Sequence, residues 1–189
     1  MGTKVGIDLG IKNLAVTSDG EIFDNPHSYE NNLKKLRRAQ RRLSRKQKGS
    51  HNREKQRIKV ACIHKKIHNQ RTDSVHKMTI SLVRKYDVIC IEDLNVRGMI
   101  KNRRLAKSIS DASFGEVRRQ LEYKCGWYGR ELIRVDRWYP SSQTCSECGH
   151  VNTKIKNPGI RYWKCPKCGK EHDRDINAAI NILKKGTAV

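Results

Sequence analysis

Residues 4–10 read K-V-G-I-D-L-G and residues 88–93 read V-I-C-I-E-D, and these two stretches decide the expected fold. Each is a short apolar segment with an acid at its end, Asp8 in the first and Glu92 in the second. The second is a continuous apolar run, as expected for a central strand that is buried on both faces. A buried unpaired carboxylate is costly. The two acids therefore predict a compensating cation at the end of the sheet.

A third acid opens the C-terminal segment D-R-D-I-N-A-A-I-N-I-L, which has the pattern of a helix packed on a sheet. Asp173 is suited to cap this helix at its N-terminus. Asp175 lies one step inside the helix and is suited to face the sheet, and spacing alone does not decide between the two. Magnesium prefers oxygen ligands and commonly binds a few carboxylates together with substrate phosphate. This combination suits hydrolysis of a phosphodiester bond.

The rest of the chain supplies the other elements of an α/β fold. A strong turn at Asp19-Gly20 predicts a three-stranded meander over residues 4–24. A last strand is expected at 131–136. Apolar periodicity predicts helices over about 30–48, 52–86 and 114–128, and residues 95–112 are expected to form a flexible basic loop.

Composition points to a polyanionic partner. The chain has 189 residues, a net charge of +22 and a sequence pI of about 10.0, and a charge of this size attracts nucleic acid. It has no apolar stretch long enough to span a membrane and no signal-peptide pattern, so no membrane partner is expected. Seven cysteines, an odd number, argue against a disulfide framework and for a reducing compartment.

Basic residues concentrate in the first predicted helix. Nine lysines and arginines occur between Lys34 and Lys48 without an acid, and a thin leucine stripe keeps the helical period. We expect this surface to neutralise phosphates, which makes binding salt-dependent. Arg161 and Arg174, near the third acid, are further candidates for phosphate contacts. The candidate contacts in the helix are Lys34, Lys35, Arg37, Arg38, Arg41, Arg42 and Arg45.

Two C-x-x-C pairs predict a zinc ribbon. The four cysteines follow the pattern C-x2-C-x16-C-x2-C, and a glycine follows each pair. A closed shell of four thiolates has no open position, so the site is structural, and metal binding is expected to drive folding of the ribbon. Trp163 is suited equally to the small core of the ribbon and to stacking on a base. The expected zinc ligands are Cys145, Cys148, Cys165 and Cys168.

Histidines give weaker signals. His64 and His68 share one helix face, and a solvated pair is a better interpretation than a metal site. His172 adjoins the acids and is a candidate for orienting a group there.

Taken together, G-I-D-L-G-I-K-N-L, I-E-D-L, S-S-Q-T-C-S-E-C-G-H and W-K-C-P-K-C-G-K-E-H-D-R-D-I-N-A-A-I-N-I-L resemble the TnpB (OrfB) family of transposon-associated proteins. That family is related to type V CRISPR nucleases. The resemblance implies a ribonuclease H-like (RuvC-like) mixed sheet with flanking helices and an inserted zinc ribbon. It also implies a domain layout of 1–142 for the first part of the nuclease domain, 143–170 for the ribbon and 171–189 for the last helix.

The resemblance further implies an RNA-guided DNA endonuclease in which Asp8, Glu92 and Asp175 hold two Mg²⁺ or Mn²⁺ ions. It favours Asp175 over Asp173, because the family pattern is D-x-N-A-A. The expected partners are single-stranded or unwound DNA and a guide RNA, and the expected location is the prokaryotic cytoplasm, in association with the nucleoid.

Family members carry a substantial N-terminal part, whereas this chain begins just before the first acidic strand. An alternative is therefore a DNA- or RNA-binding module that does not cut unaided. A junction resolvase of the same fold is a weaker alternative, because the zinc ribbon and the D-R-D-I-N-A-A pattern argue against it.

Overall fold

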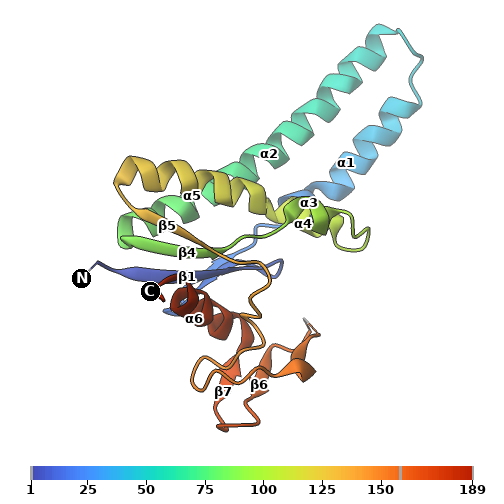
Figure 1. Cartoon of the computed structure of the whole chain (residues 1–189). Helices are drawn as coiled ribbons and strands as arrows, with labels where there is room; N and C mark the ends of the chain where they lie inside the picture. Colours follow the sequence, from blue (N-terminus) through green and yellow to red (C-terminus); the bar gives the residue numbers. More distant parts are fainter. Residues whose placement is uncertain (1, 158, 189) are drawn as a thin grey trace.

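A five-stranded mixed sheet forms the centre of the computed structural model, which describes residues 2–157 and 159–188 (Figure 1). The strand order is β3-β2-β1-β4-β5, with β1 antiparallel to β2 and parallel to β4. The predicted meander is confirmed, and Gly20 takes the positive φ of 88° that its turn requires. The strands are β1 (Lys4–Leu9), β2 (Asn13–Thr17), β3 (Ile22–Asp24), β4 (Val88–Glu92) and β5 (Glu131–Val135).

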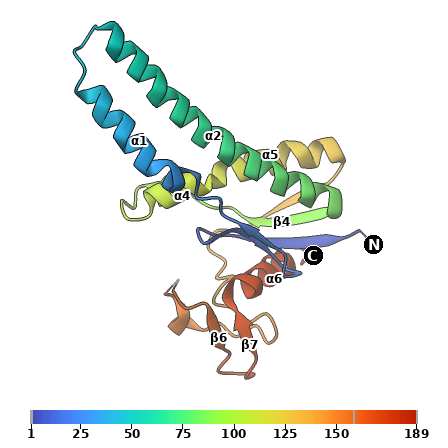
Figure 2. The ribbon, with the colours of Figure 1, turned by 180° about the vertical axis from the view of Figure 1, so that it is seen from behind.

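Helices cover both faces of this sheet. Helices α2 (His51–Lys85) and α5 (Phe114–Tyr128) lie on one face, and α6 (Arg174–Gly186) lies on the other, as both views show (Figures 1 and 2). The main core lies between the sheet and the first pair of helices. It includes Val5, Ile7, Leu82, Ile89, Ile91 and Leu121, each no more than 1% exposed.

Helix α6 lies unusually close to β1 because small residues face each other at the crossing. A Cβ atom placed on Gly6 would lie 2.1 Å from the carbonyl oxygen of Ala179, so no side chain fits there. Ala178 and Ala179 are fully buried. The glycine and the two alanines therefore fix the position of α6 over the strand that carries Asp8.

A helical hairpin extends away from the sheet. Helix α1 (Ser28–Ser44) packs against the first half of α2, close to the predicted bounds of 30–48 and 52–86 (Figure 2). Its small core contains Leu36, Ala39, Ile63 and Ile67. Ser50 caps α2 by accepting a hydrogen bond from the backbone N–H of Arg53.

The segment predicted as a flexible loop over 95–112 is largely helical, which corrects the prediction. It forms α3 (Val96–Ile100) and α4 (Ala106–Ala112). The Asn95 side chain caps α3 by accepting a hydrogen bond from the N–H of Gly98. Both helices are too short to show a clear apolar period, so sequence patterning missed them.

The segment after β5 forms a small ribbon with a short 3₁₀ helix, η1 (Thr153–Ile155), and a two-stranded sheet. Strand β6 (Tyr162–Lys164) pairs with β7 (Glu171–Asp173), so the ribbon continues past its predicted end at 170. The predicted outer bounds at residues 1 and 189 lie outside the described residues. Within the part of the chain that the structure describes, no helix is both long and apolar enough to cross a membrane.

Candidate functional site

Asp8 and Glu92 lie side by side at one end of the sheet. The parallel register pairs Ile7 with Ile91, and the next residue on each strand is an acid. The parallel pairing of β1 with β4 therefore brings together two acids that are 84 residues apart in the sequence.

Helix α6 brings Asp175 to the same end of the sheet. Asp173 occupies the N-cap, where its carboxylate accepts hydrogen bonds from the N–H groups of Asp175 (2.9 Å) and Ile176 (3.1 Å). The capping role predicted for Asp173 is thus confirmed. Asp175, in the first turn, remains available to face the sheet.

Electrostatics show that the three carboxylates share one environment. Burial raises the pKa of Asp8 well above its ordinary value, and the negative charges of Glu92 and Asp175 raise it further. Burial also raises the pKa of Glu92, against the effect of a hydrogen bond from the Ser141 hydroxyl. The site therefore has a deficit of positive charge, which suits a bound cation.

Arg161 supplies part of that positive charge from the ribbon. Its Nη1 donates to both carboxylate oxygens of Asp175, at 2.8 and 2.9 Å, and its charge lowers the pKa of Asp8. The Arg161 side chain is 38% exposed, so it remains accessible to a ligand.

Arg174 has a different environment from the one predicted. The residue is 8% exposed, and its guanidinium donates to the carbonyl oxygens of Ile155 and Asn157 and to the Ser142 hydroxyl. Its charge still lowers the pKa of Asp8. In the structure Arg174 joins the ribbon to α6, and the phosphate contact stays a prediction.

The donor set of the acids fits a divalent metal of the oxygen-binding class. The donor atoms of the three acids are more widely spaced than the four cysteine sulfur atoms. Among the described residues, only the four cysteines form a group of three or more potential ligands whose donor atoms all lie within 4.8 Å of one another. In this arrangement Arg161 donates a hydrogen bond to the Asp175 carboxylate, and Ser141 donates one to the Glu92 carboxylate.

The four cysteines form two matching turns. In each, the cysteine N–H donates to the carbonyl five residues on, and the glycine N–H donates back to the cysteine carbonyl. Gly149 and Gly169 take positive φ angles of 71° and 75°. The sulfur atoms lie 3.6 Å apart between Cys145 and Cys168 and between Cys148 and Cys165, close to the ~3.8 Å edge of a tetrahedron with zinc–sulfur bonds of about 2.3 Å. The cluster is therefore compatible with a zinc site.

Backbone donors support thiolate character at Cys165. Burial works against ionisation of Cys165, but the N–H groups of Cys168 and Lys167 outweigh it and lower the pKa of Cys165 to about 6.

The positions of Trp163 and His172 in the structure decide the two predictions made for these side chains. Trp163 is 7% exposed and packs with the cysteines, so it belongs to the small core of the ribbon. His172 does not orient a group at the acids. Its Nε2 lies 3.1 Å from the sulfur of Cys145, and its ring packs on Trp163 with 4.7 Å between centroids. Because β7 turns this side chain toward the sulfur cluster, it supports that site.

Sequence reasoning missed the residues that attach the ribbon to α6. The Asn181 amide donates to the carbonyl oxygens of Ser141 (2.8 Å) and Thr144 (2.6 Å). Asn177 donates to Thr144 at 2.8 Å and accepts from the N–H of Ser146 at 2.9 Å. Two asparagines at i and i+4 on one face of an otherwise apolar helix are the signal that was available.

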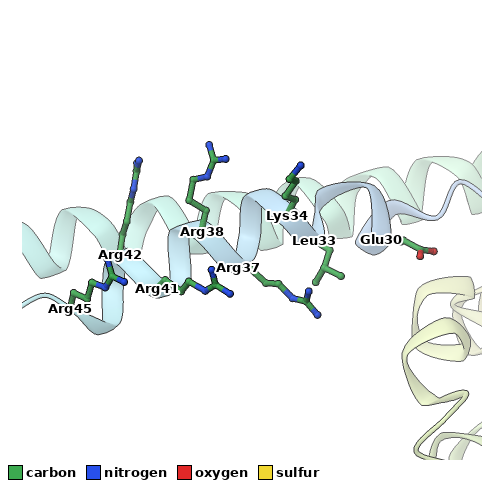
Figure 3. A pocket seen from close by; sticks show the side chains of 8 residues that line it. All are labelled: Glu30, Leu33, Lys34, Arg37, Arg38, Arg41, Arg42 and Arg45. Carbon is green, nitrogen blue, oxygen red and sulfur yellow. The ribbon is translucent and has the colours of Figure 1, made fainter.

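The basic surface predicted for the first helix is exposed as expected. All seven predicted contacts in α1 are exposed, and none makes a salt bridge within the described residues. Figure 3 shows Lys34, Arg38 and Arg42 projecting on one side of the helix, and Arg37, Arg41 and Arg45 projecting on another. Lys35 lies in the groove between α1 and α2.

Comparison with known families agrees with this architecture. The OrfB_IS605 family model, described as "Probable transposase", matches residues 1–103, more than half of the chain. The chain belongs to the OrfB family. A second model, described as "Cas12f1-like, TNB domain", matches residues 114–182 of this OrfB-family chain, which include the ribbon.

Relatives of the OrfB-family chain are longer than it is. A protein from Streptomyces pristinaespiralis named "Putative RNA-guided DNA endonuclease" is 50% identical over 97% of the chain and 45% of the relative. The Escherichia coli K12 protein "Putative RNA-guided DNA endonuclease InsQ" is 38% identical over 98% of the chain and 49% of the relative. The chain thus spans about half the length of these curated relatives.

Solved structures identify the fold. The OrfB-family chain is similar to a chain in a cryo-EM structure of the Cas12f1–sgRNA–target DNA complex, with a TM-score of 0.67 and 22% identity. That match covers 96% of this chain and 49% of the Cas12f1 chain. The predicted ribonuclease H-like (RuvC-like) mixed sheet with its four-cysteine ribbon is confirmed.

Proposed function

We propose that this chain is the nuclease part of an RNA-guided DNA endonuclease and that it hydrolyses phosphodiester bonds. The observation that carries the proposal is the convergence of Asp8, Glu92 and Asp175, from two parallel strands and one helix, in one electrostatic environment. The names of the longer relatives support the same activity.

Asp8, Glu92 and Asp175 would hold Mg²⁺ or Mn²⁺. When bound, such ions supply an activated water and stabilise the leaving oxygen. The residues of the chain have complementary roles. Asp8 is the acid whose pKa the charges of the other two raise, and Ser141 orients the Glu92 carboxylate. Arg161 is partly exposed beside Asp175, so we propose that it also contacts a substrate phosphate.

The proposed substrate is single-stranded or unwound DNA held by the cations of α1, and a guide RNA is the proposed partner of the complete protein. The exposed and unneutralised side chains of α1 support this role, because phosphate neutralisation dominates the affinity of proteins for nucleic acid. The four cysteines are proposed to hold a structural Zn²⁺. Action on DNA would place the protein at the nucleoid of a prokaryotic cell.

The ion pair between Arg161 and Asp175 favours an alternative, in which this chain binds nucleic acid but does not cut unaided. A guanidinium that satisfies the third acid competes with a metal ion for the same oxygens. In that case the remainder of a longer protein, or its RNA, is needed to release Asp175.

A cleavage assay tests the proposal. Purified chain is incubated with end-labelled single- and double-stranded DNA in Mg²⁺ or Mn²⁺, and binding is measured separately. Wild type and Asp73→Ala should cut, whereas Asp8→Ala should bind without cutting. Asp73 is a suitable control because it lies on α2 and pairs with exposed Lys77. Full activity of Asp8→Ala would contradict the site, and binding without cleavage by wild type would favour the alternative.

A further inference from the structure

A pocket lies at the base of the helical hairpin, where α1, α2 and α4 meet. We call it the junction pocket. It is separate from the carboxylates and from the exposed groove along α1. Its lining includes Tyr29, His64, Ile67, His68, Arg71 and Lys107. These residues come from three elements far apart in sequence, and both views place α4 beside the base of the hairpin (Figures 1 and 2).

A buried acid holds the junction pocket in shape. Asp111 is 6% exposed and accepts hydrogen bonds from the N–H of Tyr29 (2.9 Å) and from Nε of Arg71 (2.8 Å). One carboxylate thus caps α1 and fixes α2 and α4 against it. The pocket is preorganised, which reduces the entropy lost when a ligand binds.

The pocket offers donors and positive charge but no free acid. Arg71 donates its Nε–H to Asp111 and lines the pocket, and a guanidinium has four further N–H donors. Lys107 makes no salt bridge within the described residues, and its Nζ lies 5.8 Å from the centroid of the Tyr29 ring. His64 and His68, at i and i+4, add two exposed imidazoles from one face of α2.

We infer that the junction pocket binds a phosphate group of a polynucleotide backbone. The inference deepens the proposed function and rests on it. Lys107, Arg71 and the two imidazoles are the phosphate donors, and Tyr29 and Ile67 supply the apolar part of the lining that contacts the attached sugar. Tyr29 directly precedes the residues of α1 that line the exposed basic groove along that helix. A polynucleotide backbone bound in the groove therefore continues into the junction pocket. The two histidines, which sequence patterning assigned to solvent, thereby receive a function.

Nuclear magnetic resonance of the imidazole rings tests the inference on the intact chain. Four histidines lie on α2, of which His64 and His68 line the pocket, while His51 and His76 do not. Substitutions His64→Gln and His68→Gln assign the two signals. The chain is titrated with a short oligothymidylate and, separately, with inorganic phosphate.

The expected result is that both titrations move the His64 and His68 signals and leave those of His51 and His76 in place. Lys107→Gln should weaken phosphate binding by about 2- to 5-fold, and Lys77→Gln on the outer face of α2 should not. If oligothymidylate binds but the His64 and His68 signals do not shift, the inference is overturned and the proposed function stands. If the oligonucleotide fails to bind at all, the proposed function fails. The titration with inorganic phosphate then tests by itself whether the junction pocket binds phosphate. If the His64 and His68 signals do not shift in that titration, the inference is overturned.

Discussion

Arg161 and Asp175 connect the ribbon to the carboxylate site, with Nη1 of the arginine 2.8 and 2.9 Å from the two carboxylate oxygens of the aspartate. The pair joins the residue before β6 to the first turn of α6, so the placement of the third acid depends on the folded ribbon. It also means that a divalent ion has to share Asp175 with a guanidinium.

Removal of that guanidinium should therefore strengthen metal binding and weaken catalysis. We expect Arg161→Gln to bind Mn²⁺ several-fold more tightly, because the site loses a competing positive charge, and to cut DNA more slowly. Electron paramagnetic resonance of free Mn²⁺ gives the affinity. Weaker Mn²⁺ binding by the variant would show that Arg161 supports the metal site instead of competing with it.

The raised pKa of Asp8 has a consequence for stability. Folding disfavours the charged form, so the free energy of unfolding falls as the pH rises from the ordinary pKa of aspartate through the raised pKa. In magnesium-free buffer at neutral pH, Asp8→Asn should have a higher melting temperature than wild type. The difference should close as the pH falls toward about 4. Asp73→Asn, on the exposed surface of α2, should show no such difference, and an equal response of the two variants would contradict the burial of Asp8.

The sulfur cluster should retain one zinc ion for each chain. Cys165→Ser should lose this ion and unfold the ribbon, since structural zinc contributes on the order of 10 kcal/mol in small zinc domains at neutral pH. DNA cleavage should fall with it, because Ser141 and Arg161 lose their positions. Elemental analysis by mass spectrometry gives the zinc content, and Cys62→Ser is the control because Cys62 is exposed and outside the cluster. Zinc content that Cys165→Ser leaves unchanged would exclude the proposed ligand set.

The close crossing of β1 and α6 predicts that one methyl group added at Gly6 strongly lowers the free energy of unfolding. Gly6→Ala should lower the free energy of unfolding by about 3 kcal/mol, because the new Cβ meets the backbone of Ala179. Gly115→Ala is the matched control: it lies in α5, its added Cβ meets no atom within 4 Å, and it should stabilise by up to about 1 kcal/mol. Urea unfolding measures both variants, and similar midpoints for the two would contradict the tight crossing.

Salt dependence tests the basic surface of α1. Arg38→Gln with Arg42→Gln should weaken binding to single-stranded DNA and reduce the slope of log affinity against log salt by about 0.7 for each lost phosphate contact. Arg57→Gln should leave the slope unchanged, because Glu54 already neutralises Arg57 at 2.6 Å. An equal change for Arg57→Gln would indicate a general charge effect without a defined surface.

The sequence predicted the parts of the site that depend on regular patterns. Asp8 and Glu92 end apolar strands, and the cysteine spacing is specific, so their local geometry follows from periodicity and turn chemistry. The choice of Asp175 over Asp173 did not follow from periodicity. It came from the family resemblance, and the capping bonds made by Asp173 agree with it.

The sequence did not indicate the surroundings of residues whose contacts depend on which side of a short element they face. His172 and Arg174 are adjacent to the acids in sequence, but β7 and the start of α6 turn them toward the ribbon. A three-residue strand gives too little pattern to predict its faces. Asn177 and Asn181 were missed for a related reason: their i, i+4 spacing marks one polar helix face, but their partners are backbone groups that the sequence does not mark.

Affinity cleavage by bound iron tests the central claim, that three distant carboxylates form one divalent-metal site. Fe²⁺ replaces Mg²⁺, ascorbate and peroxide generate hydroxyl radicals at the bound ion, and the cut sites are mapped along the chain. We predict cuts beside residues 8, 92 and 175 together, all suppressed by excess Mg²⁺ and absent in Asp8→Asn. Cuts beside only one of the three, or a pattern that Asp8→Asn leaves unchanged, would contradict the shared site.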